Sequence, residues 1–426
     1  MKRNMMLLCI YSLFAAASPQ AQSQENWPQF RGPNGQGISK ATGLPVKWSA
    51  EENIAWKTEL PGEGWSSPIV WNNHIFVTTA TENGKNCHVI AIDRKTGNIL
   101  WNTLACTQEA EQFKNDLNSY ATPTPVTDGK TVFAAFSGGS FVALDFNGNI
   151  LWTNSDLKYY SQHGLGVSPI LYNDLFIFAV NPSNQEEPKK LGWQTPWDKS
   201  YLLALDKKTG KERWRGTRGL SCIGHGTPVI LKVNGKDQII SAVGEVIQGF
   251  DPTNGKLIWT VTNKGEPCVP SVAIGDGLIY STTATSAPTL AVRPDGQGDC
   301  TATHIAWKQE GYSPMMASFL YVKPCLYTCT DDRNFNCLDA TTGEFLWKIP
   351  IRNGVLSPSP LYADEKIYVL NDQGITTVLK PSKDPKQPAE VIATNELPKE
   401  NCRASIAVAG KQLIIRTKTH LWCIGK

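Results

Sequence analysis

The chain has 426 residues, of which 41% are hydrophobic and 19% charged, which is the composition of an ordinary globular protein. Its formal net charge is +3, and two of the positive side chains belong to Lys2 and Arg3, so the remainder carries about +1 (+3 minus 2). A chain this close to neutral lacks the excess of positive charge that binds nucleic acid or an anionic membrane, and neither is expected as a partner.

The first 23 residues have the pattern of a secretory signal peptide. Lys2 and Arg3 precede an apolar run over residues 5–17, and Ala21-Gln22-Ser23 supplies a cleavage site. The run is too short to span a bilayer comfortably and no second run follows, so we expect no transmembrane segment. The mature protein is expected to be periplasmic or secreted. Removal of Cys9 with the leader leaves 10 of the 11 cysteines, and their pairing into disulfides stays open.

Residues 24–53 are expected to form a turn-rich N-terminal arm. The glycines between residues 32 and 37 follow no strand and precede no helix, so they do not have the context of a nucleotide-binding loop. We expect Trp27 and Phe30 to pin this arm to the domain that follows.

From residue 54 onward one short phrase recurs. It reads AIDRKTGNILW at 91–101 and returns, with changes, at 143–152, 204–214, 249–259 and 337–347. A phrase that recurs about every 48 residues indicates units that are stacked or arranged radially. Most units also have a Ser/Thr-Pro step before an apolar strand, and a β-branched run follows a turn. This pattern predicts four short antiparallel strands per unit.

Each position that recurs between the units has a structural explanation. The aspartate can accept hydrogen bonds from the backbone amides that follow it, the glycine supplies the positive φ of the turn, and the tryptophan packs against the neighbouring unit. The residues assigned to these structural roles are Asp93, Gly97, Trp101, Asp145, Trp152, Asp206, Gly210, Trp214, Asp251, Gly255, Trp259, Asp339, Gly343 and Trp347.

The number of units follows from the spacing. Residues 54–426 hold nearly eight units of this length, and the last one ends after a third strand at Leu421-Trp422-Cys423-Ile424. An unassigned strand stands at 54–60, and joining it to the last unit would remove two open sheet edges. We therefore predict an all-β fold, a single eight-bladed β-propeller of four-stranded antiparallel blades, closed by strand 54–60 in the C-terminal blade.

The repeated Ala-x-Asp-x-x-Thr-Gly-x-x-x-Trp resembles the tryptophan-docking repeat of the pyrroloquinoline-quinone (PQQ) β-propeller superfamily. The resemblance covers essentially all of residues 54–426, and the segment Trp27-Pro28-Gln29-Phe30-Arg31-Gly32 is similar to the start of secreted bacterial PQQ-like repeat proteins. The superfamily contains quinoprotein dehydrogenases and cofactor-free binding propellers of the BamB type. The resemblance implies the propeller and leaves both functions open.

The dehydrogenases of this superfamily have two adjacent cysteines over the PQQ and a calcium ion held by acidic and amide oxygens. This chain has no Cys-Cys dipeptide, and no calcium-binding set falls on matching positions. We therefore expect no cofactor, no metal and no catalytic residue, with PQQ and calcium as the alternative. The side chains of Cys222, His225 and Cys268 could bind a soft metal ion, but their spacing lacks the paired Cys-x-x-Cys of a zinc site.

The residues that precede each first strand should ring one mouth of the central channel. Counting three residues back from the proline of each Ser/Thr-Pro step, and aligning the units without that proline by their strands, gives Trp65, Thr122, Gly166, His225, Cys268, Gly311, Ser357 and Cys402.

Aromatic and polar residues at this rim are the candidates for contact with a ligand or partner. The longest insertion, residues 181–200, carries two tryptophans that either pack on the propeller or form a binding platform for a sugar or a protein. The full set of candidates is Trp65, Tyr120, His163, Trp193, Trp197, His225, Tyr312 and Arg403.

The sequence thus favours an exported, non-catalytic and monomeric propeller of the bacterial cell envelope. Its partner would be an envelope protein or a carbohydrate ligand bound at the rim. The alternative is a divergent PQQ-dependent oxidoreductase or a carbohydrate-active enzyme.

Overall fold

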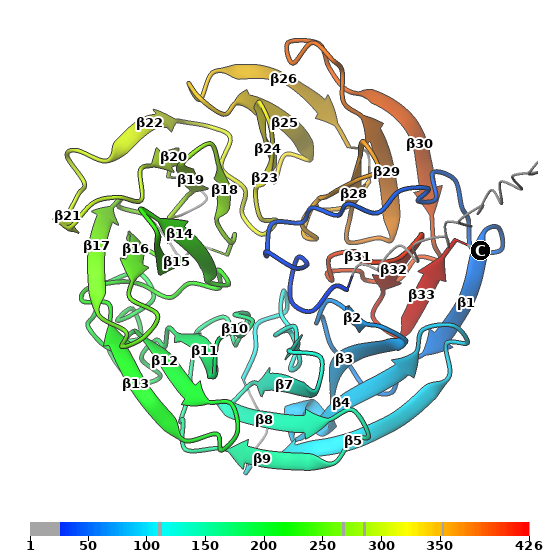
Figure 1. The fold of residues 1–426 in the computed structure, drawn as a ribbon, viewed down its shortest axis with the longest axis horizontal. Coiled ribbons are helices and arrows are strands. Elements are labelled where there is room, and N and C mark those ends of the chain that lie inside the picture. Colours follow the sequence, from blue (N-terminus) through cyan, green and yellow to red (C-terminus); the bar gives the residue numbers. More distant parts are fainter. Residues whose placement is uncertain (1–25, 110–112, 266–268, 284–286, 352, 426) are drawn as a thin grey trace, which may run out of the picture.

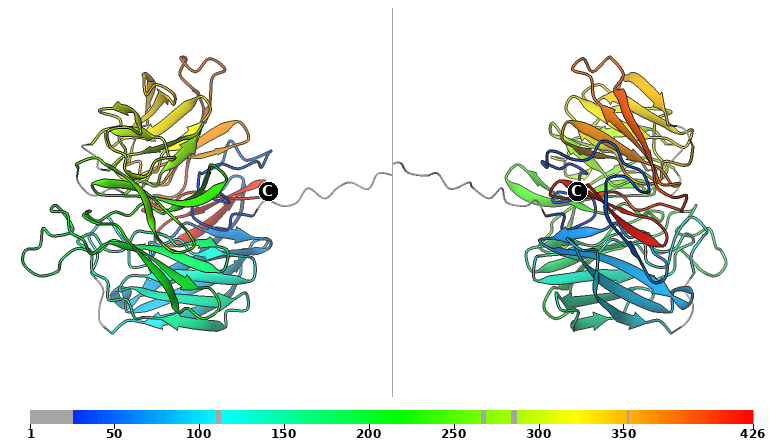
Figure 2. Two further views of the ribbon diagram at one scale, coloured as in Figure 1. Left: turned by 60° about the vertical axis from the view of Figure 1, so that its left-hand side comes forward. Right: turned by 90° about the vertical axis from the view of Figure 1, so that its right-hand side faces the viewer.

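The computed structural model describes residues 26–109, 113–265, 269–283, 287–351 and 353–425. The signal peptide expected over residues 1–23 therefore lies outside the described residues. The described chain forms eight sheets around one axis, which confirms the predicted eight-bladed β-propeller (Figure 1). In side view the blades form a thick disc from which loops project (Figure 2). Within the described ranges, no helix is long and apolar enough to cross a membrane.

Four blades make up the first half of the ring, and their strands run from the axis outward in chain order (Figure 1). Blade 1 contains β2 (Ile69–Trp71), β3 (His74–Thr81), the short 3-10 turn η1 (Glu82–Gly84), β4 (Asn86–Asp93) and β5 (Ile99–Thr107). Blade 2 contains β6 (Val126–Thr127), β7 (Thr131–Phe136), β8 (Ser140–Asp145) and β9 (Ile150–Asn154). Blade 3 contains β10 (Ile170–Tyr172), β11 (Leu175–Val180), β12 (Tyr201–Asp206) and β13 (Glu212–Thr217). Blade 4 contains β14 (Val229–Val233), β15 (Lys236–Val243), β16 (Val246–Phe250) and β17 (Leu257–Thr262), and the short β21 (Gly298–Asp299) pairs in parallel with β17 as a fifth strand.

The second half of the ring follows the same plan. Blade 5 contains β18 (Ala273–Gly275), β19 (Leu278–Ser281), β20 (Thr289–Val292) and β22 (Ile305–Gln309). Blade 6 contains β23 (Leu320–Val322), β24 (Cys325–Cys329), β25 (Asn334–Asp339) and β26 (Phe345–Pro350). Blade 7 contains β27 (Leu361–Ala363), β28 (Lys366–Leu370), β29 (Ile375–Lys380) and β30 (Glu390–Glu396). Blade 8 contains β31 (Ala407–Ala409), β32 (Gln412–Arg416), β33 (His420–Ile424) and, as its outer strand, β1 (Ile54–Glu59).

The ring is closed by β1, as the sequence predicted. This strand pairs antiparallel with β33, with Thr58 opposite Leu421 and Lys57 opposite Trp422. The last blade is therefore assembled from both ends of the propeller sequence. Its closure gives both blade 1 and blade 7 a neighbouring sheet to pack against.

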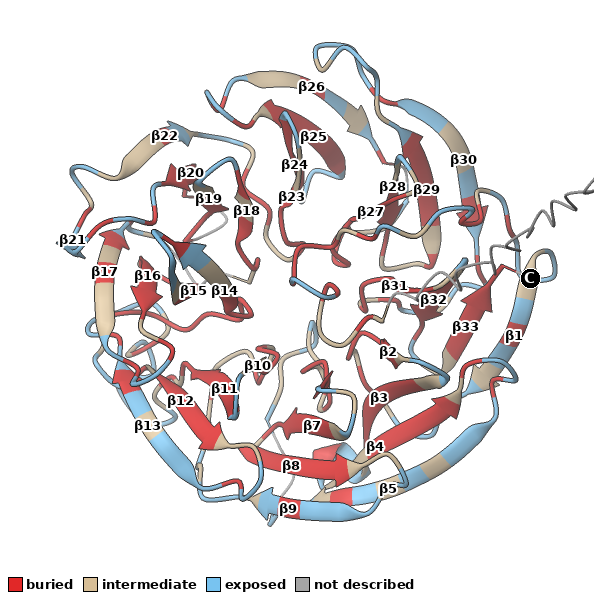
Figure 3. Ribbon diagram, in the orientation of Figure 1, coloured by how far each residue is buried: buried red, intermediate tan, exposed pale blue. Residues whose placement is uncertain are grey.

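The apolar core lies between the blades. Middle strands such as β8 are buried along almost their whole length, whereas outer strands such as β9 and β13 expose most of their residues (Figure 3). One core cluster, for example, joins Phe76 of blade 1 to Val142 of blade 2. A single four-stranded sheet cannot bury both of its faces, so the blades stabilise one another.

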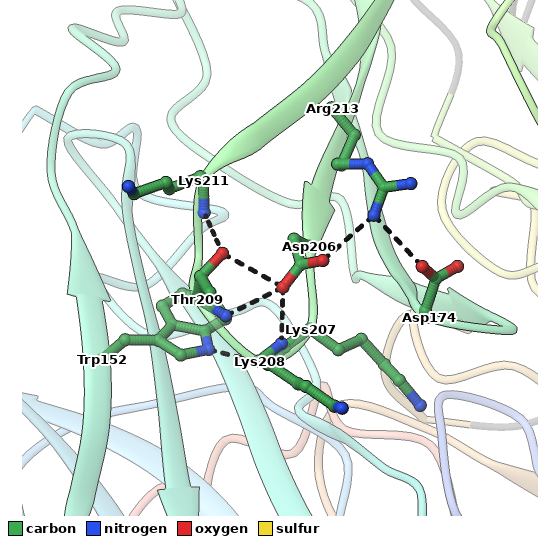
Figure 4. A network of polar contacts seen from close by, with 8 residues as sticks. All are labelled: Trp152, Asp174, Asp206, Lys207, Lys208, Thr209, Lys211 and Arg213. Carbon is green, nitrogen blue, oxygen red and sulfur yellow. Dashed lines mark hydrogen bonds and ion pairs between the residues drawn. The ribbon is translucent and has the colours of Figure 1, made fainter.

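The repeated phrase forms a clamp between neighbouring blades, shown for blades 2 and 3 in Figure 4. Asp206 Oδ1 accepts the backbone N–H groups of Lys208 and Thr209, both at 3.0 Å, and so closes the turn of blade 3. The indole Nε1 of Trp152, on blade 2, donates to the carbonyl of Lys207 at 2.8 Å. A Cβ at Gly210 would lie 2.5 Å from the Trp152 ring, and φ there is +68°, so the turn needs glycine.

The same indole-to-carbonyl bond joins other blades, at 2.8–3.1 Å: Trp56 to Arg94, Trp101 to Phe146, Trp307 to Ala340 and Trp347 to Pro385. Two of the repeat tryptophans pack on the next blade without this bond: Nε1 of Trp214 has no partner among the described residues, and Nε1 of Trp259 donates to Gln238 Oε1 within its own blade at 2.9 Å. In blade 5 the connection between β20 and β22 carries β21, and Gly298 of β21 pairs with Trp259 itself.

A second ring of contacts lies near the axis. In every blade a serine or threonine stands two positions before the first residue of the inner strand, and its backbone N–H donates to the side-chain hydroxyl of its counterpart in the next blade, at 2.9–3.2 Å. All eight side chains are buried. We call this set the hydroxyl ring, and its members are Ser67, Thr124, Ser168, Thr227, Ser271, Ser318, Ser359 and Ser405.

The N-terminal arm reaches the axis and covers part of the central opening (Figure 1). Trp27 exchanges two 2.8 Å backbone hydrogen bonds with Val70 of blade 1 and is 1% exposed. Farther along, the buried Arg31 guanidinium donates to the carbonyl of Phe319 at the start of blade 6. The backbone N–H of Tyr362 in blade 7 donates to the carbonyl of Gly37 at 2.8 Å. The arm is thus built into the propeller rather than being a separate unit.

The hydroxyl ring gives the first testable prediction. Thr124→Val keeps the shape of the side chain but leaves the buried backbone N–H of Ser67 without its acceptor. We expect it to lower the free energy of unfolding by about 1–3 kcal/mol, measured by urea denaturation. Thr124→Ser, the matched control, keeps the hydroxyl and should cost less than about 1 kcal/mol. Equal losses in the two variants would show that the hydrogen bond contributes nothing.

Candidate functional site

A cavity of about 390 Å³ lies on the axis, within the size range of small-molecule sites. The hydroxyl ring supplies one tier of its wall through seven of the eight members, all but Ser168. A second tier is formed by the residue two positions before each hydroxyl. Its members are Trp65, Thr122, Gly166, His225, Val269, Met316, Ser357 and Arg403. We call this space the central cavity.

Counting from the prolines finds five members of this tier and misses three. In blade 6 the residue after the ring hydroxyl is Phe319 rather than proline, so counting from Pro314 gives the exposed Gly311 where Met316 stands. In blade 8 the strand alignment is one residue short, and it gives the buried Cys402 instead of Arg403. In blade 5 the same shift gives Cys268, which lies outside the described residues, and the wall residue is Val269.

The structure brings five of the eight candidate residues into the cavity wall: Trp65, His163, Trp193, His225 and Arg403. The other three pack elsewhere. The Tyr120 ring lies beside Gly84, Trp197 Nε1 donates to the carbonyl of Pro182 at 3.1 Å, and Tyr312 stacks on Phe345 with 4.7 Å between ring centroids.

The other large wall residues are not among the eight candidates that the sequence predicts. Phe30 of the arm, Leu117 and Met315 add apolar surface, and the amides of Asn115 and Asn118 add polar groups. A count from the serine rather than the proline of each step finds Met316, but no comparable signal exists for Phe30.

His225 is a buried imidazole without a hydrogen-bond partner. It is 8% exposed, and neither ring nitrogen has a partner among the described residues. Gly166 leaves room for it, since a Cβ there would lie 3.0 Å from His225 Nδ1. His163 lies between His225 and Trp193, with ring centroids 6.1 and 5.9 Å away. Burial, and secondarily His163, lowers the pKa of His225 to about 3, so the ring is neutral near pH 7.

Arg403 is the one charged side chain in the described wall of the central cavity. Its Nη1 donates to Ser357 Oγ at 3.3 Å and lies 3.5 Å from Met316 Sδ. No carboxylate of the described chain forms an ion pair with it, and its Nε has no partner there. Burial lowers the pKa of Arg403, while the more distant Asp372 opposes that shift. Arg403 lines the cavity, and its Nη2 makes no hydrogen bond with the described residues, so the guanidinium has hydrogen-bonding capacity to spare.

The wall does not suit a calcium-bound quinone. Calcium takes carboxylate and carbonyl oxygens, and no aspartate or glutamate is among the described residues that line the cavity. In the part of the chain that the structure describes, no group of three or more His, Cys, Asp or Glu side chains could hold a metal ion.

Comparison with known proteins gives a family and a fold. The family model described as outer membrane protein assembly factor BamB matches residues 38–181, 195–297 and 244–384. No curated protein sequence matches significantly. BamB from Moraxella catarrhalis superposes with a TM-score of 0.61 at 15% identity, over 88% of this chain and 97% of that chain. The computationally designed Ika8 protein superposes with a TM-score of 0.58 at 10% identity, over 86% of this chain and 98% of that chain.

The buried imidazole predicts how stability depends on pH. The pKa of His225 is about 3 in the folded protein, against the ordinary value of 6.5. The contribution of neutral His225 is therefore present above pH 6.5 and is lost as the pH falls toward 3. Relative to His225→Gln, the wild type should lose about 3 kcal/mol of unfolding free energy between pH 7.5 and pH 4, measured by urea denaturation. Parallel pH curves for the two proteins would contradict this account.

Proposed function

The chain belongs to the family of the outer membrane protein assembly factor BamB, and from this premise we propose that it is an exported, non-catalytic propeller of the bacterial cell envelope. In this role it holds a protein partner at the mouth of its central cavity. Export relies on the signal peptide proposed for residues 1–23.

One observation carries the proposal, which is the set of buried polar groups left without partners in the cavity wall. They are the two ring nitrogens of His225, Nε1 of Trp65 and Nε of Arg403. A buried polar atom without a hydrogen bond costs about 1–3 kcal/mol, and native proteins retain few of them. The described chain has 21 such atoms, and four of them belong to three residues of this one wall, which supports an occupant that reorients these side chains and completes their hydrogen bonds.

The rim beside these groups supports a protein as the partner. Leu117 lines the cavity and is 49% exposed, and Phe113 on the same segment is 48% exposed. Leu220, in the segment that leads to His225, is 68% exposed. Leu117 lines the cavity, Phe113 and Leu220 stand on the connections that lead to the wall residues Thr122 and His225, and we call these three the mouth residues. Large exposed apolar side chains near a polar cavity are typical of protein–protein interfaces.

The segment that carries two mouth residues is held in a defined position. Asn118 Nδ2 donates to the carbonyls of His163 and Leu165, at 2.8 and 3.2 Å. The ring of Phe113 contacts Tyr160, with centroids 5.5 Å apart. An ordered apolar rim loses little conformational entropy on binding, which favours recognition.

Site-specific photo-crosslinking in the native cell envelope tests the proposal. A photoreactive phenylalanine analogue at Leu117 or Leu220 should give one discrete crosslinked protein. The same analogue at Val391, which is 48% exposed on the outer strand of blade 7, should give none and is the matched control. Crosslinks of equal strength at Val391 would contradict docking at the mouth.

A separate assay tests the non-catalytic assignment. With added PQQ and calcium, the purified protein should show no stoichiometric quinone absorbance and no dye reduction above background. Turnover with one bound quinone per chain would overturn the proposal and support the oxidoreductase alternative.

A further inference from the structure

The hydroxyl ring is rich in hydrogen-bond donors. Each of its eight hydroxyls accepts one backbone N–H, and in the described structure none of them donates to a protein acceptor. A serine or threonine hydroxyl carries one proton of its own that it can donate. Seven of these hydroxyls line the central cavity, so their protons are available to an occupant.

The charge of the described cavity wall favours an anionic ligand, as the hydroxyl donors do. Arg403 contributes a guanidinium that makes no ion pair with the described chain, and the described wall contains no carboxylate to repel an anion. Guanidinium groups and hydroxyl donors both bind carboxylate and phosphate oxygens. A cationic ligand would find no opposite charge among the described residues of the wall.

The rest of the wall is apolar and accommodates a hydrophobic body. Trp65, Val269 and Met316 stand in the same tier as Arg403, while Phe30 and Leu117 line other parts of the cavity. Methionine and aromatic side chains adapt well to flat or irregular apolar groups. Burial of such a group beside a fixed cation gives both affinity and orientation.

We propose that the central cavity binds a small organic anion, with its carboxylate or phosphate on Arg403 and the hydroxyl ring and its apolar body against Trp65 and Met316. This assignment rests on the binding role proposed above for the same cavity. It needs no metal ion, because Arg403 and the ring hydroxyls supply the charge and the donors.

Isothermal titration of the mature protein with a matched naphthalene series tests the proposal. The probes are 2-naphthoate, 2-naphthyl phosphate, neutral 2-naphthol and cationic 2-naphthylmethylammonium. We expect one site per chain that binds at least one of the anions about 10-fold or more tighter than 2-naphthol. The tighter of the two anions identifies the head group as carboxylate or phosphate. Binding of 2-naphthol or of the ammonium probe as tightly as both anions would overturn the proposal.

Variants of Arg403 separate charge recognition from cavity shape. Arg403→Gln should weaken the better anion about 10-fold or more and leave 2-naphthol unchanged, whereas Arg403→Lys should recover part of the anion affinity. Arg213→Gln is the matched control, because it removes the same charge from an exposed ion pair with Asp174 and Asp206. It should bind every probe like the wild type. An equal loss of anion and naphthol binding in Arg403→Gln would overturn the assignment.

The two experiments separate a failure of the anion-binding proposal from a failure of the protein-binding role. A variant that does not fold is recognised by its thermal unfolding, and Arg403→Lys then carries the test. Crosslinking at Leu117 without anion binding would leave the protein-binding role standing and remove only the ligand. Anion binding without crosslinking at the mouth would support the ligand and remove the protein-binding role.

Discussion

The hydrogen bonds of the hydroxyl ring are the constraint on which the centre of this molecule depends. Each inner strand begins where its preceding serine or threonine can give its N–H to the next blade, and Ser405 returns the chain of bonds to Ser67. Because these bonds fix all eight blades at one height and angle, they also fix the residue two positions earlier in each blade. The second tier of the cavity wall is therefore a consequence of the ring.

At the outer radius a different interaction holds the same blades. The indole of Trp152 lies against Gly210 of the next blade and donates to the carbonyl of Lys207. The hydroxyl ring joins all eight blades near the axis, the indole bonds join five pairs of neighbouring blades at the outer edge, and apolar side chains fill the space between the two sets of contacts. The repeated phrase thus belongs to the architecture, whereas the second tier of the cavity wall differs from blade to blade.

The propeller was predictable because its repeat is local and periodic. The residues of the cavity wall were only partly predictable. His225 follows from the Ser/Thr-Pro step, since that step marks the start of an inner strand. Met316 does not, because blade 6 keeps the serine but has Phe319 in place of the proline. Phe30 reaches the wall through contacts such as Arg31 with Phe319, which are 288 residues apart and leave no pattern in the sequence. The sequence predicts Tyr312 at the rim, but its ring stacks on Phe345 instead.

The pairing of β1 with β33 also sets the timing of assembly. A chain that is synthesised from its N-terminus delivers β1 before all the other described strands and β33 after them. Until β33 emerges, β1 has no partner strand, and the seven complete blades form an open arc with an unsatisfied sheet face at each end. Closure is a single late event that joins distant parts of the chain. A truncation of a few C-terminal residues would therefore affect the whole ring, whereas a lengthened surface loop would affect one blade.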